Sequence, residues 1–433
     1  MIWIKDGMVI DPVGDVVYRA DLVIENGRIS RILKDGEALG EESSGDVQVI
    51  DGTGLMVAPG LADTHVHFRD PGFTYKEDID SGAAAAVRGG FTQIVLMANT
   101  KPPVDNVETL CYVLDKGRGT GIHIASCVNV TRQMEGKELV DMETLAKAGA
   151  AGFTDDGIPL VDEELVRKAM IEARKWDKPI SFHEEDPALI VNNGVNAGKV
   201  AAHYGIGGSP REAEIGLVKR DLELARQTGA EVVIQHISTK EGVALVRQAK
   251  QRAAEKGRNN IHAEATPHHF SLTEEAVLAY GTLAKMNPPL REEADRQAVI
   301  EGLRDGTIDL IATDHAPHSE EEKKRRITEA PSGIIGLETA LPLGITNLFD
   351  AQQFPMDMLI DRMSTAPARM YNLPAGTLSE GAAADIVIFD AKAVQTVGGF
   401  ASKSSNSPFT GQKLNGVVKY TIVDGAVVYQ AES

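Results

Sequence analysis

Cysteine, positive charge and long apolar runs are all scarce in this sequence of 433 residues. Only two cysteines occur, Cys111 in an expected helix and Cys127 in an expected strand, and we interpret both as buried small side chains. A disulfide framework is therefore excluded, and a reducing, cytoplasmic compartment is expected. The charged amino terminus, MIWIKDGMVI, favours the same compartment because a signal peptide needs an apolar stretch there.

Lys and Arg number 44 against 63 Asp and Glu, which leaves a formal net charge of −19. Because this charge repels phosphate backbones, no nucleic-acid partner is expected. One basic cluster begins at Lys323 and ends at residue 326, directly after three glutamates, and we interpret it as a solvated helical face without a role. No apolar run approaches the ~18 residues of a membrane span, so we expect a soluble protein without a membrane partner.

Two sequence styles alternate along the chain and predict an α/β protein with an added β-rich module. Residues 1–59 and 373–433 consist of short alternating runs broken by Gly and Asp, and we expect them to form the two parts of a small β-sandwich domain. The polar stretch 34–46 is expected to be an exposed loop. Residues 60–372 alternate short apolar strands with helices, which predicts a (β/α)₈ TIM-like barrel, with an open doubly wound sheet as the alternative.

The expected strands of the barrel share one feature, which is an apolar start and a His, Asp or Asn near the carboxyl end. They begin at Gly60, Phe91, Ile122, Ala150, Pro179, Glu231, Asn260 and Ile308. In a barrel of parallel strands, the carboxyl ends hold the active site. Amphipathic helices with acidic residues early and basic residues late are expected at 77–90, 161–176, 211–229 and 240–256.

His65 and His67 are spaced i, i+2, so both imidazoles point to the same face of a strand. Taken alone, they could be two ordinary histidines. Further candidate ligands follow other strands, namely the pair Asp155 and Asp156, then His183, His236 and Asp314. Four imidazoles and two carboxylates are enough to hold two Zn²⁺ ions if one carboxylate bridges them. Core or surface roles for these polar side chains are the alternative, and Mn²⁺ or Co²⁺ could also occupy such a site.

A zinc pair of this kind predicts hydrolysis of an amide-like bond. It lowers the pKa of bound water to about 7 and polarises a carbonyl oxygen. A carboxylate beside that water can take its proton and pass it to the departing nitrogen. Asp314 is the candidate for this catalytic role.

A series of motifs resembles the cyclic amidohydrolases of the amidohydrolase superfamily, and most closely the class I dihydroorotases. The resemblance spans nearly the whole chain and rests on APGLADTHVHFRDPG, MANTKPPVD, GFTDDG, FHEED, QHIS, KMNPPLR and IATDHAPH followed by APSGIIGLET. It implies one zinc held by His65, His67 and Asp314 and another held by His183 and His236, with Asp156 as the bridge. Many relatives bridge with a carboxylated lysine, whereas FTDDG has none, which matches the class I pattern. One or two zinc ions per subunit are implied, and two are expected.

The substrate that the resemblance implies, dihydroorotate, carries a carboxylate. Arg69 offers a planar fork that can clamp a carboxylate, with a surface ion pair to Asp63 or Asp70 as the alternative. Asn99, at the end of the second strand, can add an amide donor. The resemblance implies further contacts with the substrate from His67, Asn287, His318 and the backbone of Ser332 and Gly333.

The resemblance predicts the reversible, zinc-dependent ring closure of N-carbamoyl-L-aspartate to L-5,6-dihydroorotate in de novo pyrimidine synthesis. The nearest alternative is a hydantoinase, dihydropyrimidinase or allantoinase, which shares the zinc chemistry but lacks the carboxylate clamp. A non-catalytic homologue that serves as a scaffold is the alternative from a different class. A homodimer and an association with an aspartate transcarbamoylase are left open as partner arrangements.

Overall fold

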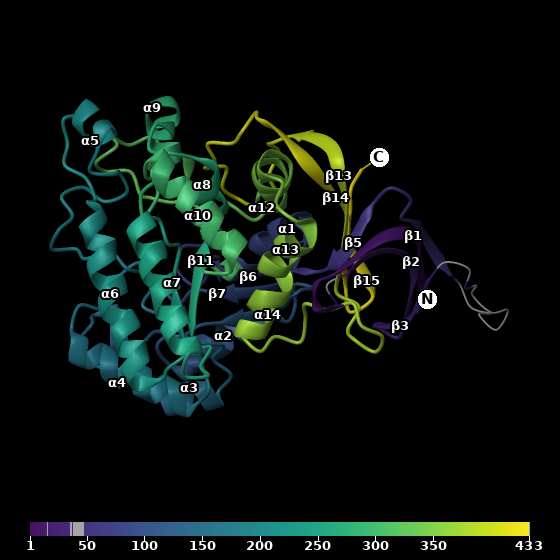
Figure 1. Cartoon of the computed structure of the whole chain (residues 1–433), viewed down its shortest axis with the longest axis horizontal. Coiled ribbons are helices and arrows are strands. Elements are labelled where there is room, and N and C mark those ends of the chain that lie inside the picture. Colours follow the sequence, from purple (N-terminus) through teal and green to yellow (C-terminus); the bar gives the residue numbers. More distant parts are fainter. Residues whose placement is uncertain (15, 35–36, 38–46, 433) are drawn as a thin grey trace.

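The computed structural model describes residues 1–14, 16–34, 37 and 47–432. Most of the loop expected at 34–46 therefore lies outside the described residues. Figure 1 shows a β-rich part that contains both chain termini and, beside it, a larger part in which helices surround strands. Each described helix is too short or too polar to cross a membrane.

Both chain ends contribute to one eight-stranded sheet with the order β15-β14-β13-β5-β1-β2-β3, in which β4 pairs with β1. Antiparallel pairing of Ala58 with Val387 joins the two ends of the chain. Buried aliphatic side chains such as Ile4, Leu22 and Ile388 fill one face of the sheet. The strands are β1 (Ile2–Asp11), β2 (Val16–Glu25), β3 (Arg28–Leu33), β4 (Gln48–Asp51), β5 (Met56–Pro59), β13 (Ile386–Thr396), β14 (Lys413–Val423) and β15 (Ala426–Gln430).

Parallel strands form the centre of the larger part in two sheets, β6-β7-β8 and β12-β11-β10-β9. Their bounds are β6 (Leu61–Val66), β7 (Phe91–Leu96), β8 (His123–Ser126), β9 (Ile180–Phe182), β10 (Val232–Ile234), β11 (Ile261–Ala265) and β12 (Leu310–Ile311). Isolated parallel bridges link the two sheets at both edges. Phe153 pairs with Val128 and with Ile180, and Val66 pairs with His315, which follows β12.

The strand expected from Ala150 is present only as the two bridges of Phe153. A side chain supplies some of the hydrogen bonds that a regular strand would make here. The Asp155 carboxylate accepts hydrogen bonds from the backbone N–H groups of Val130 and Thr131 at 2.8 and 3.2 Å. Satisfying these buried N–H groups with a carboxylate removes the need for a regular strand at this position. Asp155 is thereby committed to the backbone.

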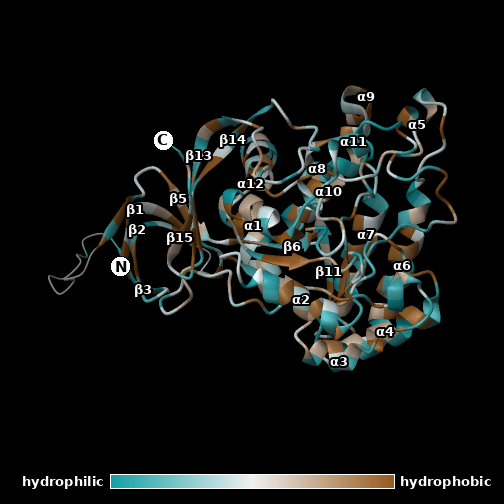
Figure 2. Cartoon of the chain, turned by 180° about the vertical axis from the view of Figure 1, so that it is seen from behind, coloured by the Kyte–Doolittle hydropathy of each residue, from teal (hydrophilic) through white to brown (hydrophobic). Residues whose placement is uncertain are grey.

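The predicted amphipathic helices at 77–90, 161–176, 211–229 and 240–256 are confirmed as α1 (Ile79–Arg88), α4 (Glu163–Lys175), α6 (Arg211–Thr228) and α7 (Lys240–Ala254). In α4 the Asp162 side chain accepts the N–H groups of Glu164 and Leu165, and Arg174 and Lys175 occupy the last turn. Such caps and charges stabilise the two ends of a helix. In Figure 2 these helices show both hydrophilic and hydrophobic residues along their length, whereas the strands that they surround are mainly hydrophobic.

The remaining elements are mostly short. The helices are α1 (Ile79–Arg88), α2 (Val107–Gly117), α3 (Met142–Lys147), α4 (Glu163–Lys175), α5 (Lys199–His203), α6 (Arg211–Thr228), α7 (Lys240–Ala254), α8 (Pro267–Ser271), α9 (Ala276–Tyr280), α10 (Glu293–Asp305), α11 (Glu320–Lys323), α12 (Ala340–Leu343), α13 (Met356–Ile360) and α14 (Ala366–Met370). Short 3₁₀ segments occupy Pro12–Gly14, Arg132–Met134 and Gly281–Ala284, and π-helical segments occupy Gly344–Asp350 and Asp361–Thr365.

Candidate metal centre and substrate cavity

Polar side chains that follow separate strands converge on Asp156. Its Oδ1 lies 3.4 Å from Nε2 of His65 and 3.7 Å from both Nδ1 of His183 and Nε2 of His236. Its Oδ2 lies 3.4 Å from Nε2 of His67. All five side chains are buried. One carboxylate therefore faces four imidazoles at the carboxyl ends of the parallel strands.

Asp314 joins the same cluster from the segment after β12. Its Oδ1 lies 3.0 Å from Nε2 of His67 and 3.6 Å from Nε2 of His65. Asp314 and His236 have left-handed backbone angles, with φ of 48° and 31°, which L side chains rarely adopt. Strained backbone of this kind is characteristic of functional sites, where the surrounding packing holds it.

Unsatisfied atoms in this cluster fit a divalent cation. Nε2 of His65 and Oδ1 of Asp156 are buried and have no hydrogen-bond partner among the described residues. Nδ1 of His183 and Nε2 of His236 lie 3.0 Å apart. Two unprotonated nitrogens repel each other at this distance, so either one of them carries a proton or both bind a cation. Imidazole nitrogens and carboxylate oxygens are the ligands that Zn²⁺ takes in catalytic sites. The residues present therefore suit the metal implied by the sequence.

Neighbouring side chains orient the ligand histidines, and one of these neighbours, Glu264, is not among the site residues predicted from the sequence. The Nδ1 of His65 hydrogen-bonds Glu264, which leaves Nε2 facing the cluster. The Nδ1 of His67 hydrogen-bonds Oδ1 of Asn99 at 2.9 Å in the same way. Carboxylates behind ligand histidines fix the ring and raise its basicity. The available signal was a glutamate, Glu264, in the short strand IHAEA, whose other polar residue is His262.

The cluster is strongly polarised. Burial alone would raise the pKa of the Asp156 carboxyl, but His65, His183 and His236 hold it well below its usual value. Burial likewise opposes protonation of His183, yet Asp156 and Glu185 raise its pKa to about 9. The ionised carboxylate of Asp156 thus favours positive charge on the His183 ring, and a metal cation would provide that charge in place of a proton.

A cavity of about 400 Å³ opens beside the cluster. Its walls include every residue expected to contact the substrate, namely His67, Arg69, Asn99, Asn287, His318, Ser332 and Gly333. The cluster residues Asp156, His183, His236 and Asp314 line it as well. The structure therefore brings the predicted substrate contacts together with all the predicted ligands except His65, which lies behind Asp156 and Asp314 outside the cavity wall.

Arg69 lies in this cavity and not in the alternative surface ion pair. Asp63 accepts backbone N–H groups, and Asp70 pairs with Lys116 at 2.5 Å. Neither carboxylate pairs with Arg69 in the described part of the chain. The Nε of Arg69 donates to the carbonyl oxygen of Pro317 at 3.3 Å, and its φ of 61° adds a third strained residue to the site.

Comparison with known proteins matches residues 56–428 to the Amidohydrolase family. A dihydroorotase of Clostridioides difficile is 55% identical over 431 residues, with 100% of both chains covered. A dihydroorotase of Clostridium acetobutylicum is 50% identical over 432 residues, covering 99% of this chain and 100% of the other. This chain belongs to the amidohydrolase family.

Solved structures with high TM-scores share this fold. An L-hydantoinase from Arthrobacter aurescens superposes with a TM-score of 0.87 at 24% identity, covering 100% of this chain and 96% of the other. A dihydropyrimidinase from Brevibacillus agri gives a TM-score of 0.84 at 23% identity, covering 99% of this chain and 95% of the other. At such low identity these structures establish only the shared fold. The sequence relatives, at twice that identity, are dihydroorotases.

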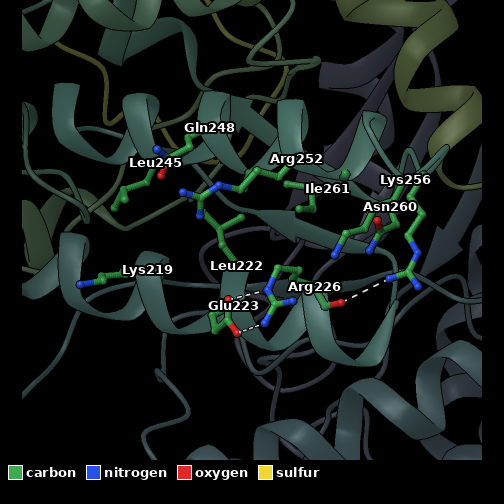
Figure 3. Close-up of a pocket in the computed structure, with 13 residues that line it drawn as sticks. Lys219, Leu222, Glu223, Arg226, Leu245, Gln248, Arg252, Lys256, Asn260 and Ile261 are labelled. Atoms are coloured by element: carbon green, nitrogen blue, oxygen red, sulfur yellow. Dashed lines mark hydrogen bonds and ion pairs between the residues drawn. The ribbon is translucent and has the colours of Figure 1, made fainter.

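A second cleft, between α6 and α7, lies by the amino end of β11 and lacks the chemistry of this family (Figure 3). Its floor is apolar, and Arg226 on its rim pairs with Glu223. Arg226 and Arg252 occupy the last turns of their helices, where positive charge compensates the helix dipole. These contacts explain the basic rim without a ligand.

Proposed function

We propose that the chain catalyses the dihydroorotase reaction, the reversible ring closure of N-carbamoyl-L-aspartate to L-5,6-dihydroorotate with loss of water. The observation that carries this proposal is the placement of Arg69 in the same cavity as the Asp156 cluster. A hydrolytic centre beside a carboxylate clamp matches a cyclic amide that bears a carboxylate. The close relatives named dihydroorotase support the same activity, which acts on a cyclic amide in pyrimidine biosynthesis.

We further propose that the cluster holds Zn²⁺, with two ions per subunit expected. His65, His67 and Asp314 would hold one ion, His183 and His236 the other, and Asp156 would bridge them. The first grouping is itself a buried ligand group, and a second such group joins Asp156 and His236 with His65. His183 lies outside both groups, and its Nδ1 is 3.7 Å from Oδ1 of Asp156. When bound, the metal makes a water molecule acidic and polarises the ring amide carbonyl.

The substrate carboxylate is bound by the guanidinium of Arg69, with Asn99 and His318 beside it. Asn287 and the backbone of Ser332 and Gly333 contact the ring. Binding at these groups orients the amide toward the cluster and makes the reaction effectively intramolecular. His67 belongs to both sets, because it lines the cavity and faces Asp156.

Asp314 moves the proton. In the hydrolytic direction, a bond forms between the water oxygen and the amide carbon, and the bond from that carbon to the ring nitrogen breaks. Asp314 takes the proton of the water and delivers it to the leaving nitrogen. Burial would raise the pKa of Asp314, but His67 and His65 hold it below its usual value, so the carboxylate starts the cycle ionised.

Substrate choice tests the proposal directly. The isolated protein should turn over dihydroorotate far faster than dihydrouracil or allantoin, neither of which offers Arg69 this carboxylate. Preference for dihydrouracil or allantoin would assign the chain to the alternative cyclic-amide hydrolases. An inactive protein that binds no added zinc would support the scaffold alternative. Asp314→Asn should keep its metal and lose most activity, and near-normal turnover would reject the assigned role.

We also propose that residues 60–372 form a closed (β/α)₈ barrel, supported by the bridges of Phe153 and of Val66 with His315. Residues 1–59 and 373–433 would then form the β-sandwich domain, supported by their shared sheet. A homodimer, an association with aspartate transcarbamoylase and a cytoplasmic location stay predictions. Light scattering of the protein, alone and mixed with the transcarbamoylase, would test both partner arrangements.

A further inference from the structure

Lys323 is buried, although the sequence places it in a basic cluster that we expected to be solvated. It ends the short helix α11 and is only 4% exposed, whereas Lys324 and both following arginines are exposed. Burying an ammonium group costs free energy unless hydrogen bonds and opposite charge compensate it. The expectation of a solvated cluster is therefore wrong for Lys323.

The ammonium of Lys323 holds the loop that closes one side of the cavity. Its Nζ donates to the carbonyl oxygens of Pro331 and Gly333 at 2.9 and 3.0 Å. Lys285 donates to the carbonyl oxygen of Ala330 at 2.7 Å. His318 donates from Nε2 to the carbonyl oxygen of Ser332 at 2.8 Å. Four consecutive carbonyl groups, residues 330–333, are thus engaged by side-chain donors.

These donors also leave positive charge beside the cavity. Lys323 and Lys285 are buried without a carboxylate at ion-pair distance in the described ranges, and Glu322 on the same helix pairs with Lys76 at 2.9 Å. His318 adds no compensating negative charge, because an imidazole is neutral or positive, and the ammonium of Lys76 lies 3.3 Å from its Nδ1. Burial and the nearby Lys285 lower the pKa of Lys323 to about 7, while Glu322 acts in the opposite direction.

We propose that Lys323 is a positioning residue of the substrate site, which fixes loop 330–333 and supplies positive charge that the bound carboxylate balances. The inference rests on the proposed dihydroorotase function. An ordered loop presents Ser332 and Gly333 to the substrate in one conformation, so no binding free energy is spent on ordering it. With their carbonyl dipoles engaged, loop residues repel an incoming carboxylate less.

Replacing Lys323 separates this role from catalysis. Lys323→Met keeps the length of the side chain and removes its charge and donors, so the KM for dihydroorotate should rise about tenfold or more. The kcat should stay within about threefold, because the cluster around Asp156 is untouched. Metal content should equal that of the wild type. Lys324→Met, one residue along and exposed, is the matched control and should leave both constants unchanged.

Proton uptake gives a second readout that does not depend on turnover. Orotate has the same ring carboxylate, so its binding at pH 7.5 should drive protonation of Lys323 and take up part of a proton. Calorimetry in buffers of different ionisation enthalpy measures this uptake, which should persist in Lys324→Met and be lost in Lys323→Met. The charged groups that face Lys323 and could share the proton are Lys285, Glu322 and His318.

The outcomes are distinct. An unchanged KM in Lys323→Met, or a kcat that falls in step with lost metal, would overturn the positioning role. If Lys323→Met does not fold, the wild-type protein still decides, because orotate binding without proton uptake would also overturn it. Failure of the wild type to hydrolyse dihydroorotate would reject the proposed function itself, which is a different result from an active wild type with an indifferent Lys323.

Discussion

Histidines occupy both ends of the parallel strands, and the two ends use them differently. At the carboxyl ends, four imidazoles converge on the single carboxylate of Asp156. At the amino ends, each ring has carboxylates to itself. Among the described residues, His262 faces Asp309 and Glu231, both at 3.6 Å, and shares neither carboxylate with another histidine.

This contrast shows that burial of a histidine does not by itself mark a metal site. His262 is nearly as buried as His183, and the pKa of each is raised to about 9 by facing carboxylates despite burial. The difference lies in the ratio of imidazoles to carboxylates. At the carboxyl ends, Asp156 and Asp314 face four imidazoles, and these rings can bind a shared cation as neutral ligands instead of each taking up a proton. Four changes would test this comparison.

Metal removal should have the largest effect, because it acts only on the carboxyl ends. Chelation should lower dihydroorotate hydrolysis at least about a thousandfold, since no group of the chain replaces the acidified water. Added Zn²⁺ should restore the rate. Initial rates beside elemental analysis measure this effect, and full activity in metal-free protein would contradict the proposed chemistry.

Arg69→Ala should come next, with kcat/KM about a hundredfold lower, because a charged donor pair for the carboxylate is lost. Metal content should not change, since Arg69 is not among the expected ligands. Arg252→Ala, on the rim of the second cleft, is the matched control and should be silent in the same assay. Wild-type kcat/KM in Arg69→Ala would assign Arg69 a structural role.

Glu264→Gln should lower zinc affinity about 10- to 100-fold, since the carboxylate behind His65 is replaced by a neutral amide. Competition with a chromogenic chelator measures the affinity. Glu231→Gln removes a carboxylate from His262 at the amino end and should leave zinc affinity as it is. Equal losses in both variants would mean that the two ends do not differ as described.

His262→Gln should have the smallest effect, on stability alone. The raised pKa of His262 means that its ion pairs stabilise the fold fully below pH ~6.5, the unfolded value, and that this stability is lost as the pH rises through about 9. We expect a cost of about 1–2 kcal/mol at pH 6 and much less at pH 10. Urea unfolding at both pH values measures it. A cost that grows with pH would reverse the assigned sign.

Particular residues show which parts of the site could be predicted from the sequence. The i, i+2 spacing of His65 and His67 and the position of Asp314 after an apolar strand placed these side chains at one end of the strands, and the structure brings them together. The residues themselves did not distinguish Asp156 from Asp155, and only the resemblance favoured Asp156. The structure distinguishes the two, because the Asp155 carboxylate accepts hydrogen bonds from the backbone N–H groups of Val130 and Thr131 and does not face the histidines.

By itself, the sequence determined which side chains lie at the carboxyl ends of strands, because local periodicity sets strand direction and side-chain face. The tertiary structure alone decided that Glu264 supports His65 and that Lys323 is buried behind loop 330–333 while Lys324 is exposed. Both facts depend on which distant segment packs against a residue. The local charge pattern does not depend on that packing. A lysine in a basic run is therefore predicted to be solvated, and only the tertiary structure shows that it is buried.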